Sequence, residues 1–561
     1  MKHSWKRICA SGLSALLCLS LAASCGSPDT SGESSAAGTE SGAEESTQGT
    51  WETDTSPITF DVYVNGSWWD IEWTTDIATR STAYITEKTG VTINFIAPSG
   101  NETEKMNTMI ASRSFPDMVL SNSYDVATQS MIDADLCLPL LQLADQYDET
   151  FYDVVTESQI EWFRKSDGNL YDYPNFSHSY DIATEKLEEE DPAFMADFAS
   201  DTCLLARKDI YEAIGSPDLT TPEGFLDALE KAKELTSQSG ETVSLLDLDE
   251  NGANAVNYIR EFAAIPNYND DGSLHDWTTD PEFIRWVKVL REAYERGLIS
   301  TDTFIDDRAQ IDEKRQNAQY FLTFAGRSNI EICNTYLYND MNGKETGVYY
   351  IPVDAMRNSN GDDPTINGKM LLNGWMNTYI MEGCKDPARA IRFLNYMNGE
   401  EGQHDAFWGE EGVTFDYVDG VETFKDFILD GSVPYEDLVK NYLVNELNWT
   451  WTNYNILPSY TSMLPQQYDP NDDIVEWVSQ YLYFQPETIA ITLEGGSDAA
   501  VAESNINQEW GATFVSLVTA ESEEAFDQIL ENFLAERDNL GFDIVQEARQ
   551  EVVDTNRAKL E

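Results

Sequence analysis

The chain has 561 residues, of which 100 are acidic and 35 are basic, so its formal net charge is −65. Proteins that bind nucleic acid or dock directly on anionic lipids need clustered lysine and arginine, so this balance excludes both classes for the body of the protein. About 510 residues follow the first fifty, which is enough for a large core and too much for one ordinary domain.

The first residues have the layout of a secretory signal. A short basic stretch precedes a mostly apolar run from Ile8 to Ala23, and no acidic residue occurs before Asp29. An apolar run of roughly 15 residues is too short for a stable membrane span and is typical of a signal peptide. We therefore expect residues 1–24 to be a signal peptide.

The apolar run ends in Leu21-Ala22-Ala23-Ser24-Cys25, which resembles a bacterial lipobox, although Ala22 stands where leucine is usual. The resemblance implies that the Cys25 thiol receives a diacylglycerol. The alternative is an ordinary signal peptide that contains a cysteine by chance.

Residues 26–50 contain no aromatic side chain and no aliphatic side chain larger than alanine. Such a segment cannot bury enough apolar surface to fold, and a coil of about 30 residues spans roughly 30 Å. We therefore expect residues 25–55 to be a lipidated cysteine and a disordered tether that holds the body at the extracellular face of the cell membrane.

The body begins with a pattern of alternating strands and helices. Residues 58–64 alternate apolar and polar side chains, residues 90–96 and 115–120 form two further strand patterns, and Met106, Met109 and Ile110 suit a helix between them. A strand, a crossover helix and another strand indicate a parallel sheet. The fold class is therefore α/β.

Three later helices are marked by polar caps followed by proline. They begin at Thr221-Pro222, Asp280-Pro281 and Asp386-Pro387, and the last two end before Gly297 and Gly399. Residues 320–324 predict another strand.

Several segments resemble one family when they are taken in order. They are Phe115–Val119, Asp167–Pro174, Leu204–Asp209 continuing to Thr221–Phe225, Tyr294–Ile299, Asp386–Tyr396, Glu400–Gln403 and Trp408–Gly412. In this order they resemble the extracellular solute-binding proteins of ABC importers (family 1-like), particularly the large lipoprotein branch of Firmicutes. The resemblance covers most of residues 58–420, and the last hundred residues match less distinctly.

The resemblance implies a two-lobed, periplasmic-binding-protein-like (type II) fold, with strands crossing at a hinge and the ligand between the lobes. By analogy, lobe I takes residues 56–200 plus 375–400, and lobe II takes residues 205–370 plus 405–561. It also implies that the partners are ABC permease subunits and that the protein acts as a monomer without a cofactor.

The loop after the first strand carries Trp68, Trp69, Asp70 and Trp73. Aromatic faces stack on the apolar faces of sugar rings, and a neighbouring carboxylate accepts hydrogen bonds from hydroxyls. The alternative is that these tryptophans pack the lobe, because tryptophan buries a large area anywhere.

Further candidate ligand contacts follow from position in the expected fold. Ser121, Asn122 and Tyr124 follow the third strand, where short polar groups orient a ligand or simply make a turn. Residues near lobe crossings, in the Gly-x-Glu-Gly region or after the 320–324 strand complete the set: Tyr173, Trp375, Trp408, Glu411 and Arg327. Core packing, or pairing with local acids in the case of arginine, is the alternative for these residues.

A metal site is not expected. Residues 247–252 begin like a calcium loop, but Tyr258 stands where the twelfth position requires a glutamate, so a turn is the better interpretation. The four cysteines of the body, Cys137, Cys203, Cys333 and Cys384, form no CxxC pair. We expect them to be buried apolar residues, with any disulfide unassigned.

We expect the protein to capture a small solute for import, most simply an oligosaccharide, without chemistry on it. One alternative is a surface glycan-binding protein that never meets a transporter. Another is an extracellular glycoside hydrolase with a carboxylate pair. The body has neither GxSxG nor HExxH and only three histidines, so the sequence offers little for catalysis. Peptides and other solutes remain open as ligands.

Overall fold

A computed structural model describes residues 48–560, except 123–124, 192–193, 196–197, 199–201, 250–251, 369, 371, 431, 444–446, 448–449, 465–467 and 489–490. The expected signal peptide, Cys25 and most of the expected tether lie outside the described residues. Residues from Thr47 onward form one compact unit. Among the described helices, none is both long and apolar enough to cross a membrane.

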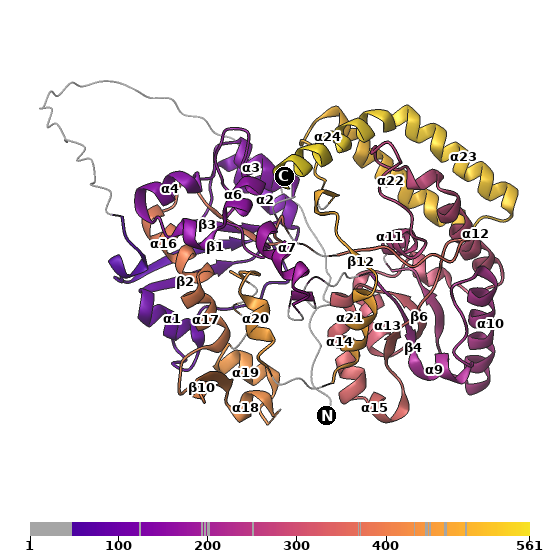
Figure 1. Cartoon of the computed structure of the whole chain (residues 1–561), viewed down its shortest axis with the longest axis horizontal. Coiled ribbons are helices and arrows are strands. Elements are labelled where there is room, and N and C mark those ends of the chain that lie inside the picture. The colour runs from indigo at the N-terminus through magenta and orange to yellow at the C-terminus, as the bar shows by residue number, and fades with distance from the viewer. Residues whose placement is uncertain are drawn as a thin grey trace, which may run out of the picture. The chain divides into compact units, whose positions relative to one another are not determined.

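The first half of the body is built on a four-stranded sheet with the order β2-β1-β3-β9 (Figure 1). Its strands are β1 (Ile58–Val64), β2 (Val91–Ile96), β3 (Met118–Ser121) and β9 (Asn377–Ile380). β1 pairs in parallel with both β2 and β3, whereas β9 runs antiparallel to β3. The crossover helices are α1 (Ser81–Thr89) and α2 (Glu102–Ser112). The predicted strand–helix–strand unit and its parallel sheet are confirmed.

Gly90, between α1 and β2, occupies a position that only glycine fits. Its φ is +73°, and a Cβ would lie 2.1 Å from the carbonyl oxygen of Thr55. This close approach lets Ile58 N–H donate to the Gly90 carbonyl at 3.0 Å, which fixes where β1 begins beside β2.

The hydrophobic core around the first sheet includes residues that are far apart in the sequence. It includes helices α4 (Leu140–Tyr147), α16 (Pro387–Asn398) and α17 (Glu400–Trp408). It also includes the buried side chains of Ala406, Leu443, Leu447 and Trp451. The structure therefore differs from the lobe division expected at residue 405, because these later apolar residues pack on the first sheet.

The second half is built on another four-stranded sheet, with the order β5-β6-β4-β7. Its strands are β4 (Leu204–Arg207), β5 (Ser244–Asp247), β6 (Tyr320–Phe324) and β7 (Tyr350–Pro352). β5 and β6 are parallel, and β4 runs antiparallel to both β6 and β7. Helices α10 (Pro222–Ser239), α11 (Ala253–Phe262) and α12 (Pro281–Glu295) pack on this sheet in a separate core.

The predicted capped helices all form. Thr221 Oγ1 accepts a hydrogen bond from Gly224 N–H at 3.2 Å at the start of α10. The Asp280 carboxylate accepts from Glu282 N–H at 2.8 Å at the start of α12. Asp386 does the same for Arg389 N–H at 3.0 Å at the start of α16. Each cap satisfies a backbone donor that the helix itself leaves unpaired.

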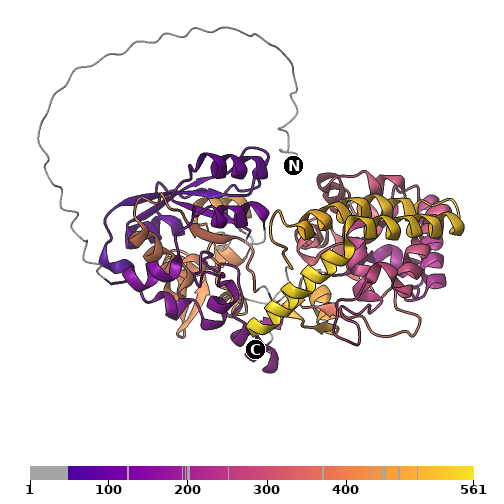
Figure 2. The same ribbon diagram turned by 90° about the horizontal axis from the view of Figure 1, so that it is seen from above.

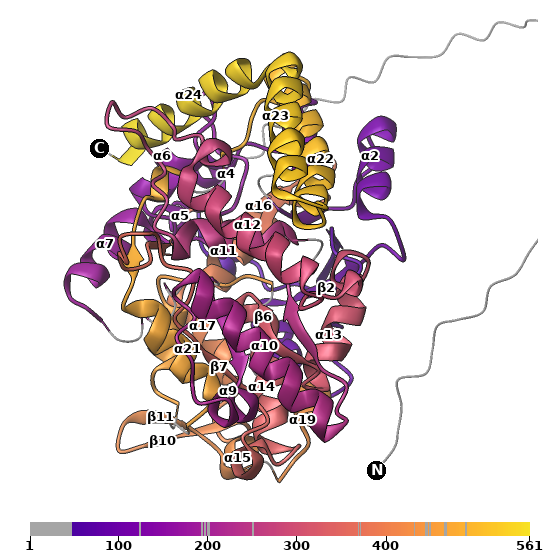
Figure 3. The same cartoon turned by 90° about the vertical axis from the view of Figure 1, so that its right-hand side faces the viewer.

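Two short parallel strands, β8 (Ile366–Asn367) and β12 (Leu482–Tyr483), pair with each other apart from the two main sheets. Three long helices end the chain, α22 (Asp498–Val518), α23 (Glu523–Leu540) and α24 (Phe542–Leu560). Figure 3 shows α22 and α23 side by side. Figure 2 shows α24 running from them toward the first half, where Lys559 Nζ donates to the carbonyl of Trp162 in α6 (Glu157–Phe163) at 2.7 Å.

The remaining α-helices and strands lie between the elements described above. The helices are α3 (Val126–Asp133), α5 (Phe151–Val154), α7 (Tyr180–Glu188), α9 (Lys208–Ala213), α13 (Arg308–Gln316), α14 (Arg327–Asn339), α15 (Gly343–Thr346), α18 (Asp426–Leu429), α19 (Tyr435–Asn441), α20 (Leu457–Thr461) and α21 (Pro470–Ser479). β10 (Phe415–Val418) and β11 (Val421–Phe424) form an antiparallel hairpin.

Candidate ligand-binding site

Three strand ends meet at one edge of the first sheet. β1 and β3 both finish here, and antiparallel β9 starts here, with Asn377 opposite Ser121. The side chains that follow the strands therefore lie together: Asn65 N–H donates to the Leu120 carbonyl at 2.9 Å, and its amide lies 3.4 Å from Ser121 Oγ. Ligands of open α/β sheets bind at such carboxyl ends.

An aromatic pair stands at this edge. The rings of Trp68 and Trp375 are stacked, with centroids 5.4 Å apart and 14° between their planes. Trp68 is 51% exposed, which is unusual for so large an apolar side chain. We call Trp68 and Trp375 the aromatic platform.

Two glycines make the platform possible. At Gly66, a Cβ would lie 2.9 Å from the indole of Trp68, so the ring folds back over a residue with no side chain. Gly374 has a φ of +66°, and a Cβ there would lie 2.3 Å from Asn377 Oδ1. The turn that presents Trp375 therefore needs glycine.

Unsatisfied polar groups lie beside the platform. Trp69 is buried under Trp68, with ring centroids 5.7 Å apart, and its indole N–H has no hydrogen-bond partner among the described residues. The same holds for Asn122 Oδ1 at the end of β3. Because buried polar groups in folded proteins are normally paired, a donor and an acceptor left over at a sheet edge indicate a place for a polar ligand.

Some of the candidate residues are buried and do not face a ligand at this edge. Trp73 and Tyr173 are buried in the core, where Trp73 Nε1 donates to Thr86 Oγ1 at 3.0 Å and Tyr173 Oη donates to Asn395 Oδ1 at 2.9 Å. Burial raises the pKa of Tyr173 well above its ordinary value. Ser121 is also fully buried and shares a hydrogen bond of 2.9 Å with Thr128. These three side chains are therefore part of the core and are not exposed to a ligand.

The remaining candidates lie elsewhere or are exposed. Trp408 is 1% exposed and packs against Phe424, with centroids 4.5 Å apart, inside an aromatic cluster beside the β10–β11 hairpin. The structure corrects its expected position facing a ligand, because neighbouring rings cover it. Glu411 is exposed next to that cluster, Asp70 is exposed in the platform loop, and Arg327 begins α14 after β6 of the second sheet. Tyr124 lies outside the described residues.

Sequence reasoning missed an aromatic row that continues from Trp375. Phe176 contacts Trp375 edge-on at 5.3 Å and Tyr454 at 5.8 Å, and Tyr454 stacks on His178 at 5.1 Å. Phe176 has a φ of +54°, which is strained for an aromatic residue. Phe176 follows directly after the Asp167–Pro174 segment, and this position could have identified it as a candidate. Tyr454 lies in a region without a distinct motif.

Acidic groups flank the edge. Glu102 at the start of α2 accepts a hydrogen bond from Ser67 N–H at 2.5 Å. Burial raises the pKa of Asp125, which lies just before α3, and the charge of Glu102 raises it further. The neighbourhood of the platform is therefore negative, which disfavours an anionic ligand there.

The calcium-like segment is occupied by an arginine. The Arg315 guanidinium is 2.8 Å from Asp247 Oδ2 and 3.0 Å from Asp249 Oδ1, and all three side chains are buried. Asp247 also accepts from Thr323 Oγ1 at 2.7 Å. Within the described residues, no cluster of side chains suits a metal ion. All four body cysteines are buried free thiols, as expected.

Solved structures share this fold. FusA of Streptococcus pneumoniae, an ABC-transporter substrate-binding protein in complex with kestose, is 14% identical, with a TM-score of 0.65 over 89% of this chain and 100% of its own. The alginate-binding protein AlgQ2 is 17% identical, with a TM-score of 0.60 over 91% of this chain and 100% of its own. An HMO-binding, ABC-transporter-associated solute-binding protein of Bifidobacterium longum infantis is 12% identical, with a TM-score of 0.61 over 90% of this chain and 99% of its own.

No curated protein matches the chain in sequence. The family model of bacterial extracellular solute-binding proteins matches residues 82–409, which is more than half of the chain. That span includes β2, α2 and β3 of the first sheet, the second sheet and the Asp386–Tyr396 helix, so the family resemblance is confirmed. With its two α/β sheets and this match, the chain belongs to the family of bacterial extracellular solute-binding proteins.

Proposed function

We propose that this protein captures an oligosaccharide on the aromatic platform and delivers it to the permease of an ABC importer. The observation that carries the proposal is the stacked pair of Trp68 and Trp375, with Trp68 half exposed at the carboxyl edge of the first sheet. A flat indole face covers the apolar face of a sugar ring, and the unpaired Trp69 N–H and Asn122 Oδ1 serve its hydroxyls.

A neutral sugar suits this edge better than an acidic solute. Glu102 and Asp125 make the edge negative, which argues against acidic ligands. FusA, which has the same fold and was solved in complex with kestose, and the HMO-binding protein of Bifidobacterium longum infantis add support for an oligosaccharide. We propose that the second lobe, including Arg327, closes over the bound sugar.

The protein acts by binding, without chemistry on its ligand. The two indole rings of the platform stack on a sugar and do not exchange protons near neutral pH. Membership of a solute-binding family supports the same conclusion. A surface glycan-binding role without a transporter uses the same platform and differs only in its partner.

We also propose that the protein is a monomer anchored by a diacylglycerol on Cys25 at the extracellular face of the membrane. The support is the Leu21–Cys25 segment and the polar stretch after it. Replacing Cys25 by serine in the producing cell should move the protein from the membrane fraction to the medium. Retention of the C25S protein in the membrane fraction would refute the anchor.

The binding proposal is tested on the chain from Thr47 onward, which forms one compact unit. We would measure calorimetric titrations with mono- and oligosaccharides, short peptides and polyamines, and then look for product. One oligosaccharide should bind saturably and be recovered intact. Trp68→Ala should weaken that binding by about tenfold or more, whereas Tyr417→Ala, which removes a similarly exposed ring on β10, should leave it unchanged. Binding of peptides alone would overturn the substrate class, and cleavage of the sugar would overturn the transport role.

A further inference from the structure

A polar cavity lies within the second half of the molecule. It has a volume of about 310 Å³ and lies beside the second sheet, between α11, the strands β8 and β12, and the C-terminal helices α22 and α24. None of the platform residues lines it. Ligand pockets in proteins measure about 300–1,000 Å³, so this cavity has room for one small molecule and not for a long chain.

Two neighbouring residues at the end of α11 present unpaired groups to the cavity. The Nε–H of Arg260 and the Oε2 of Glu261 are buried and have no hydrogen-bond partner among the residues the structure describes. The rest of each side chain is held in place: Arg260 Nη2 donates to Asn267 Oδ1 at 3.3 Å, and Glu261 Oε1 accepts from Asn367 N–H at 3.3 Å. One donor and one acceptor are therefore fixed and left over.

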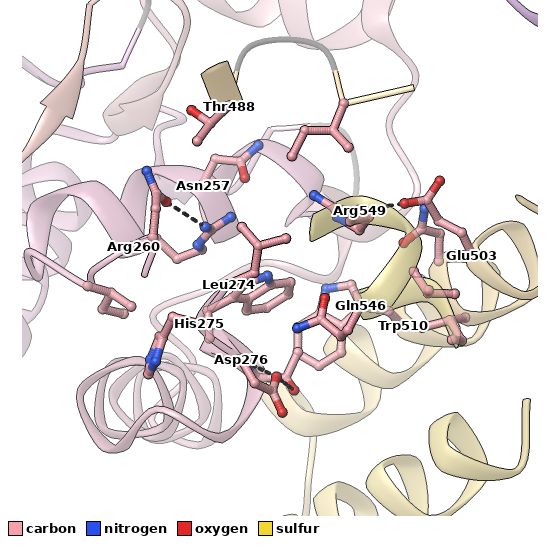
Figure 4. A pocket seen from close by; sticks show the side chains of 18 of the residues that line it. Asn257, Arg260, Leu274, His275, Asp276, Thr488, Glu503, Trp510, Gln546 and Arg549 are labelled. Atoms are coloured by element: carbon pink, nitrogen blue, oxygen red, sulfur yellow. Dashed lines mark hydrogen bonds and ion pairs between the residues drawn. The ribbon is translucent and has the colours of Figure 1, made fainter. Parts of the chain in front are cut away.

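The other charges in the cavity are neutralised in pairs. Figure 4 shows Arg260 on one side and the pair of Arg549 and Glu503 on the other, 2.9 Å apart. Arg537 pairs with Asp276 at 2.8 Å. An added anion would meet Glu261 and an added cation would meet Arg260, and burying an uncompensated charge is costly. The electrostatics therefore favour a neutral guest.

Burial raises the pKa of Glu261 to about 7. Burial lowers the pKa of Arg260, and the charge of Arg549 lowers it further. Poor solvation is the largest cause of both shifts, so each group gains from a polar partner that carries no charge of its own.

The walls suit a molecule with hydroxyls on a carbon ring. Trp277 and Trp510 meet edge-on, with centroids 5.1 Å apart, and Tyr483 of β12 forms part of the lining. Amide side chains, including Asn507 and Gln546, line the remaining wall. Aromatic surface combined with amides and one donor–acceptor pair is the chemistry that recognises sugars and polyols.

We propose that this cavity binds one neutral polyhydroxylated molecule of the size of a single sugar ring. Glu261 Oε2 accepts a hydrogen bond from one hydroxyl, and Arg260 Nε–H donates to the oxygen of a neighbouring hydroxyl. The site is separate from the platform and does not rest on the proposed function. Its guest is either a free monosaccharide or polyol, or the terminal ring of a longer chain.

The test is a calorimetric titration of the chain with glucose, galactose, mannose, fructose and myo-inositol, with acetate and putrescine as charged probes. Asn507→Trp places an indole in the cavity without removing a buried contact, because Asn507 is exposed at its lining. Gln508→Trp is the matched control, since Gln508 is the next exposed residue of α22 and does not line the cavity. Glu261→Gln removes the acceptor charge with little change of shape.

At least one neutral probe should bind to the wild-type protein and to Trp68→Ala with affinities within about twofold of each other. The affinity should fall at least tenfold in Asn507→Trp and in Glu261→Gln and stay unchanged in Gln508→Trp. An oligosaccharide that displaces the probe identifies the guest as a terminal ring, and failure to displace it identifies a free small molecule. The proposal is overturned if no neutral probe binds, if only acetate or putrescine binds, or if Trp68→Ala abolishes binding while Asn507→Trp does not.

Discussion

Trp68, in the loop after β1, stacks face to face on Trp375, in the turn before β9, so two distant parts of the chain build one aromatic surface. Each ring holds the other in place, because an isolated exposed indole would rotate freely. The pair is therefore preorganised, and a sugar that stacks on it loses less affinity to ordering the protein.

The stacking predicts a non-additive double-mutant cycle. Trp68→Ala and Trp375→Ala should each weaken oligosaccharide binding by about tenfold or more, which corresponds to about 1.4 kcal/mol. The double variant should lose much less than the sum, because either single change already disorders the platform. Calorimetry on the four proteins measures the coupling. Strictly additive losses would show that the two rings act independently.

The turn before Trp375 gives a prediction on stability. Gly374→Ala forces a residue with a Cβ into a φ of +66° and brings that Cβ 2.3 Å from Asn377 Oδ1 and 2.4 Å from the Asn175 carbonyl. We expect a loss of about 1–3 kcal/mol in the free energy of unfolding, together with weaker sugar binding. Urea denaturation measures the loss.

Gly383→Ala is the matched control for that turn, because a Cβ at Gly383 meets nothing within 4 Å. It should leave both the unfolding free energy and the affinity unchanged. Equal effects of the two substitutions would mean that the close approach at Gly374 does not constrain the turn.

The ion pairs of Arg315 with Asp247 and Asp249 give a prediction on the stability and calcium response of the calcium-like segment. Arg315→Met leaves the carboxylates of Asp247 and Asp249 buried without their main counter-charge, and removing one partner of a buried pair costs about 3–5 kcal/mol. Arg308→Met should cost far less, because Arg308 is partly exposed and lies 3.3 Å from Asp249. Thermal unfolding compares the two, and added calcium should not stabilise the wild-type protein. Stabilisation by calcium at micromolar concentration would contradict this assignment.

Glu261 makes stability depend on pH in a defined window. Burial raises its pKa from an ordinary value of 4.5 to about 7, against the opposing effects of Thr202, Asn367 and Arg260. Between these two values the folded protein holds a proton that the unfolded chain has released, so this residue's contribution to stability falls as the pH rises. The change amounts to about 3 kcal/mol across the window.

Glu261→Gln should remove that dependence. The difference in unfolding free energy between variant and wild type should shift in favour of the variant from pH 4.5 to 7 and stay constant below pH 4.5. Parallel urea titrations at several pH values give this difference and cancel the large background of other acidic groups. A difference that does not vary with pH would show that Glu261 keeps an ordinary pKa.

Local patterns predicted the local structure well. Alternation located β1, and polar caps followed by proline located α10, α12 and α16, because these signals act over a few residues. The platform was only half predicted: Trp68 and Trp375 were both candidates, but their stacking depends on tertiary packing. Trp408 shows what sequence alone does not predict. Whether a tryptophan is buried in a core or exposed to a ligand depends on which side chains cover it in the folded protein.

The division of the chain escaped prediction for a similar reason. Leu443, Leu447 and Trp451 pack on the first sheet. The sequence around these residues carries no motif that predicts this contact. Long-range contacts of this kind are selected by shape and volume, and no short pattern records them.

The contact of Lys559 with Trp162 has a consequence for how the molecule would move. The earliest described segment also packs on the first half, since Gly49 N–H donates to the Tyr147 carbonyl and Trp51 lies against Tyr396. Both the earliest described residues and the end of α24 therefore contact the first half, while α24 also packs against α22 of the second half. A movement that separates the two halves would have to break the hydrogen bond from Lys559 to Trp162.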